Sequence, residues 1–409
     1  MNTLNDTPSG ERLHIGFFGV RNAGKSSVVN AVTNQDLALV SSVRGTTTDP
    51  VKKAMELLPL GPVVVIDTPG IDDEGALGKM RVERTREVLK ETDIAVLVAD
   101  GTEGLHRADR ELLELFKTRK IPFLVVFNKV DLIAAYDRME LLHTPEGVPE
   151  ENILLCSAKT GEGINEIREA LGKLSKSASK EKLILGDLVN QGDVIVLVIP
   201  IDESAPKGRI ILPQQMVLRE ILDCQATAVC AQASDLLKTL GSLKEPPRMV
   251  ITDSQAFKTV LRDVPDSIDT TSFSILMSRY KGNLETQVRG ARALKNLTAD
   301  DTVLISEGCT HHRQCQDIGT VKLPNWIEEY CGARPNFEFT SGGEFPKDLS
   351  KYSAIVHCGG CMLNEKAMQS RIAQAVEQNV PITNYGIAIG EFQGSLSRVL
   401  RPLKEDHYV

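Results

Sequence analysis

Two groups of residues in this sequence combine types and spacings that can carry chemistry. The first is the glycine-rich stretch Gly19-Val-Arg-Asn-Ala-Gly24-Lys25-Ser26. Its glycines let the backbone curl so that N–H groups point at phosphates, while the lysine and serine are placed for the phosphates and for Mg²⁺. The second is His357-Cys358-Gly-Gly-Cys361. Soft thiolates at this spacing are typical of zinc or iron–sulfur sites.

Three more motifs follow the glycine-rich stretch, each directly after an apolar, strand-like run. They are Asp67-Thr-Pro-Gly70, Asn128-Lys129-Val-Asp131 and Ser157-Ala158-Lys159. We expect Asp67 to hold Mg²⁺ through water, and the Gly70 N–H to contact a γ-phosphate. The Asp131 carboxylate can pair with the N1–H and exocyclic amine of guanine, a donor pattern that adenine does not present. All four motifs in this order resemble the translation-factor-type GTPases.

The predicted nucleotide site therefore draws on all four motifs and on residues 45–49, which lie where GTPases of this kind have their first switch segment. The predicted binding residues are Gly19, Asn22, Ala23, Gly24, Lys25, Ser26, Ser27, Thr47, Asp67, Gly70, Asn128, Lys129, Asp131, Ser157, Ala158 and Lys159. Among them, Lys25, Thr47, Asp67 and Gly70 are the predicted catalytic residues.

Two details concern hydrolysis. Ile71 stands where Ras-like proteins carry the glutamine that orients the attacking water, so turnover is expected to be slow without other help. Asn22 in the loop and Gly45-Thr46-Thr47-Thr48-Asp49 resemble the potassium-dependent GTPases of the tRNA-modification and Era types. That resemblance implies K⁺ held by Asn22, which supplies positive charge near the transition state, and Mg²⁺ held by Ser26 and Thr47. The alternative is that Asn22 only hydrogen-bonds its own turn.

The Cys358 motif has a potential partner 49 positions upstream, in Cys309-Thr-His311-His312. Both clusters follow apolar runs, VLIS and SAIV, and the carboxyl ends of parallel strands share one edge of a sheet. We therefore expect the two clusters to meet there. Three cysteines and a histidine suit structural zinc, whereas three cysteines with an exchangeable fourth position suit a [4Fe–4S] cluster. A redox dithiol or a pair of buried thiols is the third alternative.

The elements that must position these residues alternate between apolar runs and helical stretches, which is typical of βαβ units. Residues 1–174 are predicted to form the first domain, with 1–11 as a flexible N-terminus, and SKSASKEK (175–182) a linker. A smaller segment spans 183–262, with DVIVLVIPI (193–201) and GRIIL (208–212) as strands and a helix near Pro213. The last domain, 263–409, has expected strands in SFSILMS (272–278), DTVLISEGC, NFEFTSGG, SAIVHCGGC and PITNYGIAI (381–389).

Composition excludes several classes of function. The net charge of −8 argues against a protein that wraps nucleic acid. No apolar run approaches the roughly 18 residues that span a bilayer, and the first fifteen residues lack the apolar core of a secretory signal. Eight cysteines in such a chain are expected to be reduced thiols or metal ligands. A cytoplasmic protein with no membrane and no nucleic-acid partner is the expectation.

The GTPase motifs, the middle segment, and Cys-x-His followed by His-Cys-x-x-Cys resemble the HydF family of FeFe-hydrogenase maturation GTPases over essentially the whole chain. The resemblance implies a [4Fe–4S] cluster on Cys309, Cys358 and Cys361, with His311 and His357 as a fourth ligand or as support behind the ligands. It also implies a GTP-hydrolysing scaffold that carries a transient di-iron precursor. The implied partners are the radical-SAM maturases HydE and HydG and the apo FeFe-hydrogenase.

The resulting expectation is an α/β protein with a P-loop GTPase domain, a small α/β dimerisation domain and a C-terminal parallel α/β cluster-binding domain. The resemblance implies a homodimer, and the run VIVLVIPI is expected to extend a sheet between subunits. Two other functions remain open: a ribosome- or tRNA-associated GTPase with structural zinc, and an iron- or redox-responsive GTPase with a dithiol switch. Metal and sulfide analysis separates the three.

Overall fold

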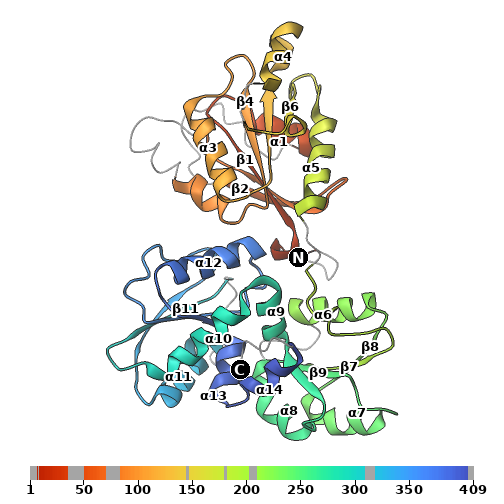
Figure 1. Ribbon diagram of the computed structural model, residues 1–409, viewed down its shortest axis with the longest axis vertical. Helices are drawn as coiled ribbons and strands as arrows, with labels where there is room; N and C mark the ends of the chain where they lie inside the picture. Colours follow the sequence, from red (N-terminus) through yellow and green to blue (C-terminus); the bar gives the residue numbers. More distant parts are fainter. Residues whose placement is uncertain are drawn as a thin grey trace. The chain divides into compact units, whose positions relative to one another are not determined.

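A computed structural model describes residues 7, 9–35, 50–70, 83–143, 147–178, 182–201, 210–308 and 318–403 of the chain (Figure 1). The chain divides into two units, residues 1–181 and 182–409. Three predicted site residues, Thr47, Cys309 and His311, lie outside the described residues. None of the helices in the described ranges offers an apolar stretch of the length that a bilayer crossing takes.

The first unit is built on a six-stranded sheet in the order β2-β3-β1-β4-β5-β6. All neighbours run parallel except β2 and β3. The strands are β1 (Leu13–Phe18), β2 (Val51–Leu57), β3 (Gly61–Asp67), β4 (Ile94–Asp100), β5 (Phe123–Asn128) and β6 (Ile153–Leu155). The apolar runs predicted as strands are confirmed. The edge strand β2 was not predicted, because its sequence VKKAMEL is largely solvent-exposed and lacks a continuous apolar signal.

Helices cover both faces of this sheet (Figure 1). They are α1 (Lys25–Thr33), α3 (Arg107–Thr118), α4 (Ala135–His143) and α5 (Ile164–Ala178). Ile15 and Phe17 of β1 pack in one core with residues of α1 and α5, and Phe18 packs in a second core with residues of α3. This alternation follows from the two-residue period of a strand. Helix α5 ends at Ala178, so the first residues of the predicted linker are helical.

The second unit begins with a four-stranded parallel sheet in the order β10-β9-β7-β8. Its elements are β7 (Val194–Val198), α6 (Leu212–Asp223), β8 (Thr227–Ala231), α7 (Leu236–Ser242), β9 (Met249–Thr252), α8 (Phe257–Asp263) and β10 (Asp269–Ser272). Strand β7 pairs on both sides, which explains its buried VIVLV run. It therefore cannot extend a sheet into a partner subunit, and the expectation for VIVLVIPI is wrong. The domain boundary predicted after residue 262 would separate β10 from the other three strands of this sheet.

Two predicted strands of this unit are wrong. SFSILMS forms most of helix α9 (Phe273–Lys281), whose first turn is capped by Ser272 Oγ accepting the Ile275 N–H at 3.2 Å. In GRIIL, Ile210 and Ile211 lie outside any strand and Leu212 begins α6, with Pro213 in its first turn as predicted. Both segments are short and apolar, and a period cannot be read from such runs.

A second parallel sheet has the order β12-β11-β13-β14. Its strands are β11 (Thr302–Ser306), β12 (Asn336–Thr340), β13 (Ala354–His357) and β14 (Ile382–Asn384), and the helices around it are α10 (Leu284–Ala293), α11 (Leu323–Cys331), α12 (Glu365–Glu377), α13 (Tyr385–Phe392) and α14 (Leu396–Leu400). The predicted strand PITNYGIAI is correct only over β14. Asn384 ends that strand and caps α13 by accepting the Ile387 N–H at 2.8 Å.

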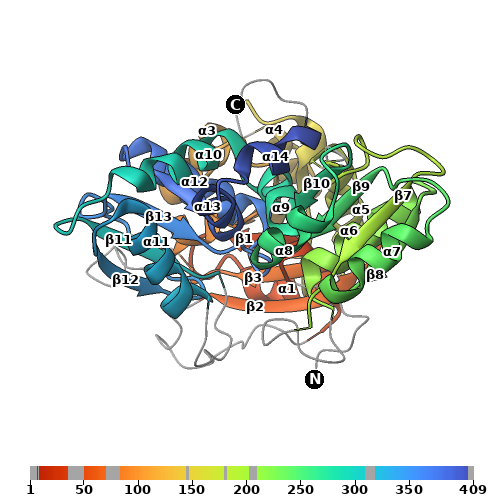
Figure 2. The same cartoon turned by 90° about the horizontal axis from the view of Figure 1, so that it is seen from below.

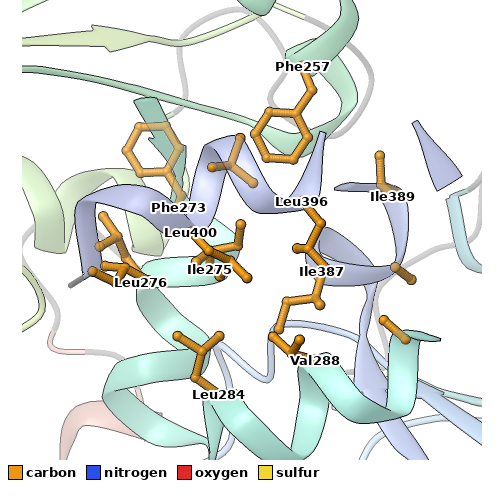
Figure 3. Close-up of a cluster of buried hydrophobic side chains, with 14 of the residues drawn as sticks. Phe257, Phe273, Ile275, Leu276, Leu284, Val288, Ile387, Ile389, Leu396 and Leu400 are labelled. Atoms are coloured by element: carbon orange, nitrogen blue, oxygen red, sulfur yellow. The ribbon is translucent and has the colours of Figure 1, made fainter. Parts of the chain in front are cut away.

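One continuous apolar core joins the two sheets of the second unit. Helices α8, α9, α13 and α14 gather between the sheet of β7 and β9 and the sheet of β11 and β13 (Figure 2). Figure 3 shows Phe257 of α8, Phe273 of α9, Ile387 of α13 and Leu396 of α14 among the side chains that meet there. The described residues between 182 and 403 therefore share one apolar core.

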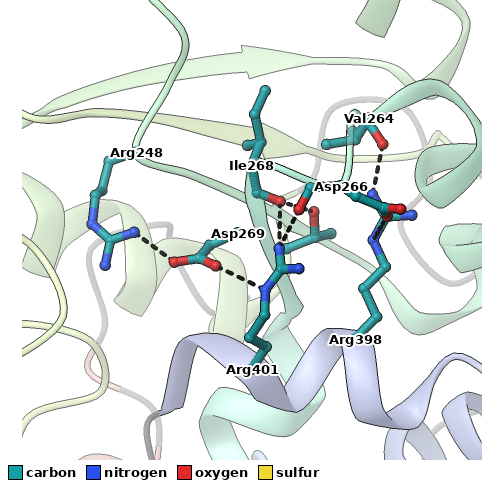
Figure 4. Close-up of polar contacts among 8 residues, drawn as sticks. Arg248, Val264, Asp266, Ile268, Asp269, Arg398 and Arg401 are labelled. Atoms are coloured by element: carbon teal, nitrogen blue, oxygen red, sulfur yellow. Dashed lines mark hydrogen bonds and ion pairs between the residues drawn. The ribbon is translucent and has the colours of Figure 1, made fainter.

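Polar contacts fasten the C-terminal end of the chain to the first of these sheets (Figure 4). Asp269 of β10 accepts from Arg248 Nη1 at 2.6 Å and from Arg401 Nε at 3.2 Å. Arg398 of α14 donates through Nη2 to the Val264 carbonyl at 2.6 Å. The contacts of Arg398 and Arg401 add directional links to the apolar core between segments that lie more than 130 residues apart in sequence.

Candidate functional site

The phosphate loop has the curled backbone that its sequence predicts. Gly19, Asn22 and Gly24 have φ values of 149°, 66° and 81°, all in the region that favours glycine or asparagine. A Cβ on Gly24 would lie 2.3 Å from Asn128 Nδ2, so the loop also needs glycine for space. Helix α1 begins directly after it, at Lys25. The first N–H groups of that helix have no partner within it and are suited to an anion.

Lys25 and Ser26 converge on the end of β3. Lys25 Nζ forms an ion pair with Asp67, and Ser26 Oγ donates to Asp67 Oδ2 at 2.8 Å. Lys25 and Asp67 are largely buried, so their interaction is only weakly screened. A cation, a hydroxyl and a carboxylate therefore meet where a phosphate and a hydrated divalent ion would bind. Gly70 lies against the loop, because a Cβ there would be 2.9 Å from Arg21 Cα.

The predicted guanine-binding residues also come together. Asn128 Nδ2 donates to the Ala23 carbonyl at 3.1 Å, and Asn128 Oδ1 accepts the Ala158 N–H at 3.0 Å. One buried amide thus ties the phosphate loop to the Ser157-Ala158-Lys159 loop. Ser157 Oγ donates to Asp131 Oδ1 at 2.8 Å, which orients the carboxylate predicted to select guanine. Asn22, Ser27 and Lys159 are exposed at the rim of this site.

Two residues that support this site were not among the predicted site residues. Asp100, at the end of β4, accepts from Lys129 Nζ at 2.5 Å and from Thr102 N at 2.9 Å. Burial alone would raise the pKa of Asp100, but the hydrogen bonds from Lys129 and Thr102 outweigh it and lower the pKa. Cys156 donates through Sγ to Asn128 Oδ1 at 3.7 Å, and burial raises its pKa to about 12, so it is a neutral thiol. Asp100 could have been identified from the sequence, because it ends an apolar strand-like run.

Cys358 lies at the carboxyl edge of the second parallel sheet, beside the end of β11. Ser306 of β11 pairs with His357 of β13, and Cys358 N donates to the Ser306 carbonyl at 2.9 Å. Gly308 N donates to Cys358 Sγ at 3.0 Å. Because Gly308 immediately precedes Cys309, the described chain reaches Cys358 one residue before the predicted upstream ligand. The Gly360 N–H also points at Cys358 Sγ, at 3.4 Å.

His357 lies behind the cysteine, fully buried. Its Nδ1 lies 2.7 Å from the Cys358 carbonyl oxygen, and its Nε2 lies 2.8 Å from Arg371 Nη1. Burial, followed by the charge of Arg371, lowers the pKa of His357 to about 3, which leaves the imidazole neutral. A neutral ring that donates from Nδ1 and accepts at Nε2 has both nitrogens engaged. Both nitrogens therefore face protein atoms, the Cys358 carbonyl and Arg371.

The donor set around Cys358 fits an iron–sulfur cluster or another thiolate-bound metal. Sulfur accepting two backbone N–H groups is the environment that stabilises a thiolate and tunes a bound cluster. Within the described ranges, no three His, Cys, Asp or Glu side chains gather as a metal-binding group. Cys361 follows in the same loop. Cys224 directly follows α6 and is half-buried against the apolar core of the second unit, whereas Cys230 is exposed on β8.

Comparison with known families matches three consecutive parts of the chain. Residues 14–129 match the model described as 50S ribosome-binding GTPase. Residues 184–282 match the hydrogen maturase F dimerization domain, and residues 285–402 match the hydrogen maturase F tetramerization domain. The two maturase models together span more than half of the chain, and their border lies between α9 and α10.

Two curated relatives each match less than half of the chain. The tRNA modification GTPase MnmE of Desulfotalea psychrophila is 33% identical over 157 residues, covering 37% of this chain and 32% of the relative. GTPase Der of Nitratidesulfovibrio vulgaris is 35% identical over 189 residues, covering 43% of this chain and 37% of the relative. The chain thus spans about a third of the length of these relatives.

A solved structure of Era from Aquifex aeolicus bound to GDP and AlF4⁻ is 22% identical, covers 53% of this chain and 91% of its own, and has a TM-score of 0.35. The ordered GTPase motifs and the two maturase models support the same assignment. The chain belongs to the HydF family, the GTPases of hydrogenase maturation.

Proposed function

We propose that this chain is a GTP-hydrolysing scaffold that carries the di-iron precursor of the FeFe-hydrogenase active site to the apo-hydrogenase. The observation that carries the proposal is the 3.0 Å hydrogen bond from Gly308 N to Cys358 Sγ. It brings the residue before Cys309 to the Cys358 motif, in a chain whose sequence also contains four GTPase motifs. HydE and HydG are the proposed sources of the cargo and its ligands, and the cytoplasm is the proposed location.

GTP binding uses the loop that already gathers Lys25, Ser26 and Asp67. Lys25 would exchange its ion pair with Asp67 for the β- and γ-phosphates, and Ser26 with Thr47 would hold Mg²⁺. Asp67 would support that ion through water. Asn22, exposed on the loop with a left-handed backbone, is the proposed K⁺ ligand, and a bound K⁺ would supply positive charge near the γ-phosphate. Asp131 selects guanine.

Cargo binding uses the cysteine edge of the second unit. Cys309, Cys358 and Cys361 are the proposed ligands of a [4Fe–4S] cluster, which supplies an iron with an exchangeable fourth position for an incoming cargo ligand. Gly308 and Gly360 donate N–H groups to Cys358 Sγ and so stabilise its thiolate form. His357 holds the Cys358 carbonyl from behind. His311 remains the proposed alternative for the fourth position.

A homodimer is proposed through the segment that matches the dimerization model. Because β7 is central, the strands of this sheet with a free edge in the described part of the chain are β8 and β10. Strand β8 is the more exposed of the two, with Thr227 and Cys230 open to solvent. An intersubunit sheet would therefore use β8.

The test separates the two sites with three variants of the full chain. Each is purified anaerobically, reconstituted with iron and sulfide, and assayed for metal content, GTP turnover and activation of apo-hydrogenase in the presence of HydE and HydG. Cys358→Ser should lose the cluster and hydrogenase activation but keep GTP turnover. Lys25→Ala should keep the cluster and lose GTP turnover and activation. Cys331→Ser, which changes a cysteine at the end of α11 and leaves a hydroxyl that can donate to the same Ala333 carbonyl, is the matched control and should resemble wild type.

Two results would contradict the proposal. A colourless wild-type protein with one zinc and no sulfide would replace it with a GTPase that has a structural zinc site. Full hydrogenase activation by Lys25→Ala would show that GTP turnover is not coupled to maturation. Substituting Na⁺ for K⁺ in the same turnover assay should slow hydrolysis severalfold, and an unchanged rate would remove Asn22 as a K⁺ ligand.

A further inference from the structure

A cleft outside the nucleotide site opens between the helical residues 83–89 and α3 of the first unit. Its volume is about 610 Å³, a size typical of clefts that bind a ligand. Thr85 and Arg86 line it from one side, and residues of α3 line it from the other. No member of the predicted nucleotide site is among the described residues that line this cleft.

The buried part of the lining is mainly apolar and belongs to the core of the first unit. Ala108 and Leu112 of α3 are buried in the same core as Val88 and Leu89, which lie on the opposite side of the cleft. Leu115 packs half-buried against that core. Close packing of the core holds these side chains in place, so the cleft presents a preformed apolar surface.

One polar atom of the lining is buried without a partner. Thr85 is 1% exposed, and its Oγ1 forms no hydrogen bond with another described residue. Buried hydroxyls are nearly always hydrogen-bonded in folded proteins, so an exception requires an explanation. Because Thr85 lines the cleft, an oxygen acceptor of a molecule bound there would supply the partner.

The rim of the cleft carries positive charge that its own residues do not neutralise. Arg86 lies on one side and Arg110 on the other, both exposed, and neither forms an ion pair with another described residue. The other charged residues of the lining, Arg107, Glu111 and Glu114, form ion pairs along α3. The unpaired charge is therefore positive, on a chain whose net charge is −8. Guanidinium groups bind carboxylates through paired hydrogen bonds.

The shape of the cleft fits an α-helix. On α3 the lining follows one face over three turns, with Arg107 and Ala108, Glu111 and Leu112, Glu114 and Leu115, and finally Thr118. At 1.5 Å per residue this face is about 16 Å long. A groove between two helices accepts a third helix whose apolar side chains recur three and four residues apart. Carboxylates at the border of its apolar face would then reach the two arginines.

We propose that this cleft is a docking site for an acidic, amphipathic helix of a protein partner. The apolar side chains of that helix contact Ala108, Leu112 and Leu115, and its carboxylates pair with Arg86 and Arg110. The proposed function assigns no docking surface to the first unit. The inference rests on the proposed function for its probes, which are HydE, HydG and the apo-hydrogenase.

The experiment measures the affinity of the full chain, with GDP bound, for each of these three purified proteins by anaerobic biolayer interferometry. The variants are Arg86→Ala, Arg110→Ala and Leu115→Gln. Arg84→Ala is the matched control, because it removes the same charge from the same helical stretch but does not line the cleft. Calorimetric titration with GDP checks that the first unit of each variant is folded.

Each of the three cleft variants should weaken the binding of at least one of the proteins about 10-fold, a loss typical of an important interface residue. The affinity of wild type for that protein should fall with rising salt, and the fall should be shallower in Arg86→Ala and Arg110→Ala. Arg84→Ala should bind like wild type. All variants should keep the wild-type affinity for GDP.

A photo-crosslinking residue at position 118 identifies the segment that docks. Thr118 is exposed at the end of the lining, so Thr118→p-benzoylphenylalanine leaves the buried part of the cleft unchanged. Mass spectrometry should place the cross-link in a segment of the partner whose apolar residues recur three and four apart beside acidic residues. A cross-link to a segment without acidic residues, or to a second copy of this chain, would overturn the inference.

Wild-type affinities in the folded Arg86, Arg110 and Leu115 variants would also overturn the inference, as would a wild-type chain that binds none of the three proteins. An equal loss in Arg84→Ala would overturn it too, because the charge of the helical stretch alone would then explain the effect. All these results leave the proposed function standing. A wild-type chain that holds no iron and activates no hydrogenase would instead refute the proposed function, so the two failures are distinguishable.

Discussion

Replacing Phe257 with alanine tests whether the two sheets of the second unit fold as one body. Phe257 lies on α8, next to the sheet of β7 and β9, and is fully buried in the core that both sheets share (Figure 3). The single tryptophan of the chain, Trp326, lies on α11 beside the other sheet and packs against the same core. Its fluorescence therefore reports on the part of the unit that does not contain the substitution.

The expected loss of stability is large. Truncating a fully buried phenylalanine to alanine leaves a cavity and costs about 4 kcal/mol. With a urea m-value of about 3 kcal/mol/M, this loss lowers the unfolding midpoint by about 1.3 M. We expect the Trp326 transition to move by that amount, together with the fall in helical circular dichroism of the second unit. The assay is equilibrium urea unfolding of the full apo-protein, followed by both signals.

Leu237→Ala is the matched control, since Leu237 is 62% exposed on α7 of the same unit. Its effect should stay within about 0.5 kcal/mol, as is usual for surface substitutions. The reasoning fails if Phe257→Ala leaves the Trp326 midpoint in place while part of the circular dichroism is lost earlier. That result would mean that the two sheets unfold independently and that the shared core contributes little.

Two further predictions concern the nucleotide site. Gly24→Ala should weaken GDP binding more than 10-fold in calorimetric titration, because its Cβ would lie 2.3 Å from Asn128 Nδ2. The control Gly104→Ala, at a glycine with a similar φ of 74° and open space around it, should bind GDP normally. Equal affinities of the two variants would remove the steric argument. Asp100→Asn should speed hydrogen exchange in β4 and β5 at neutral pH. Because the folded state lowers the pKa of Asp100, its stabilisation is complete above the unfolded value of about 3.9 and disappears as the pH falls through the lower folded value. The difference from wild type should therefore shrink below about pH 4, and a constant difference down to pH 3 would contradict the assignment.

The convergence of the nucleotide-binding motifs was predictable because each follows a strand of one sheet and has few alternatives in sequence. The pairing of Ser306 with His357 was also predictable, since both end apolar runs of parallel strands. Helix α9 was not, because most of its side chains are buried and its apolar residues do not form one stripe with a 3.6-residue period. The short strand β14 merged in sequence with α13 for the same reason: an apolar helix follows it directly.

The residues that contact the segment around Cys358 and Cys361 were harder to predict than the cysteine motif itself. Arg371 lies 13 positions after Cys358 on an otherwise ordinary helix, and Lys281 lies 77 positions before it. No spacing rule connects a buried cation to a loop that it reaches only through the tertiary fold. Burial revealed them: a lysine that is 2% exposed and an arginine that is 6% exposed need specific acceptors, and those acceptors lie around the cysteines.

The contacts of Lys281 also explain why two family models match what is one folded unit. The dimerization model ends at residue 282 and the tetramerization model begins at residue 285. Yet Lys281 donates to Leu363 across that border, and Gln369 donates back to the carbonyl of Gly282. Farther on, Arg401 of the second segment reaches Asp269 of the first (Figure 4). Neither segment contains all the contacts that stabilise it, so the segment around Cys358 and Cys361 takes its geometry from both. The sheet within the dimerization model and the cysteine-bearing edge of the other sheet are therefore parts of a single folded unit.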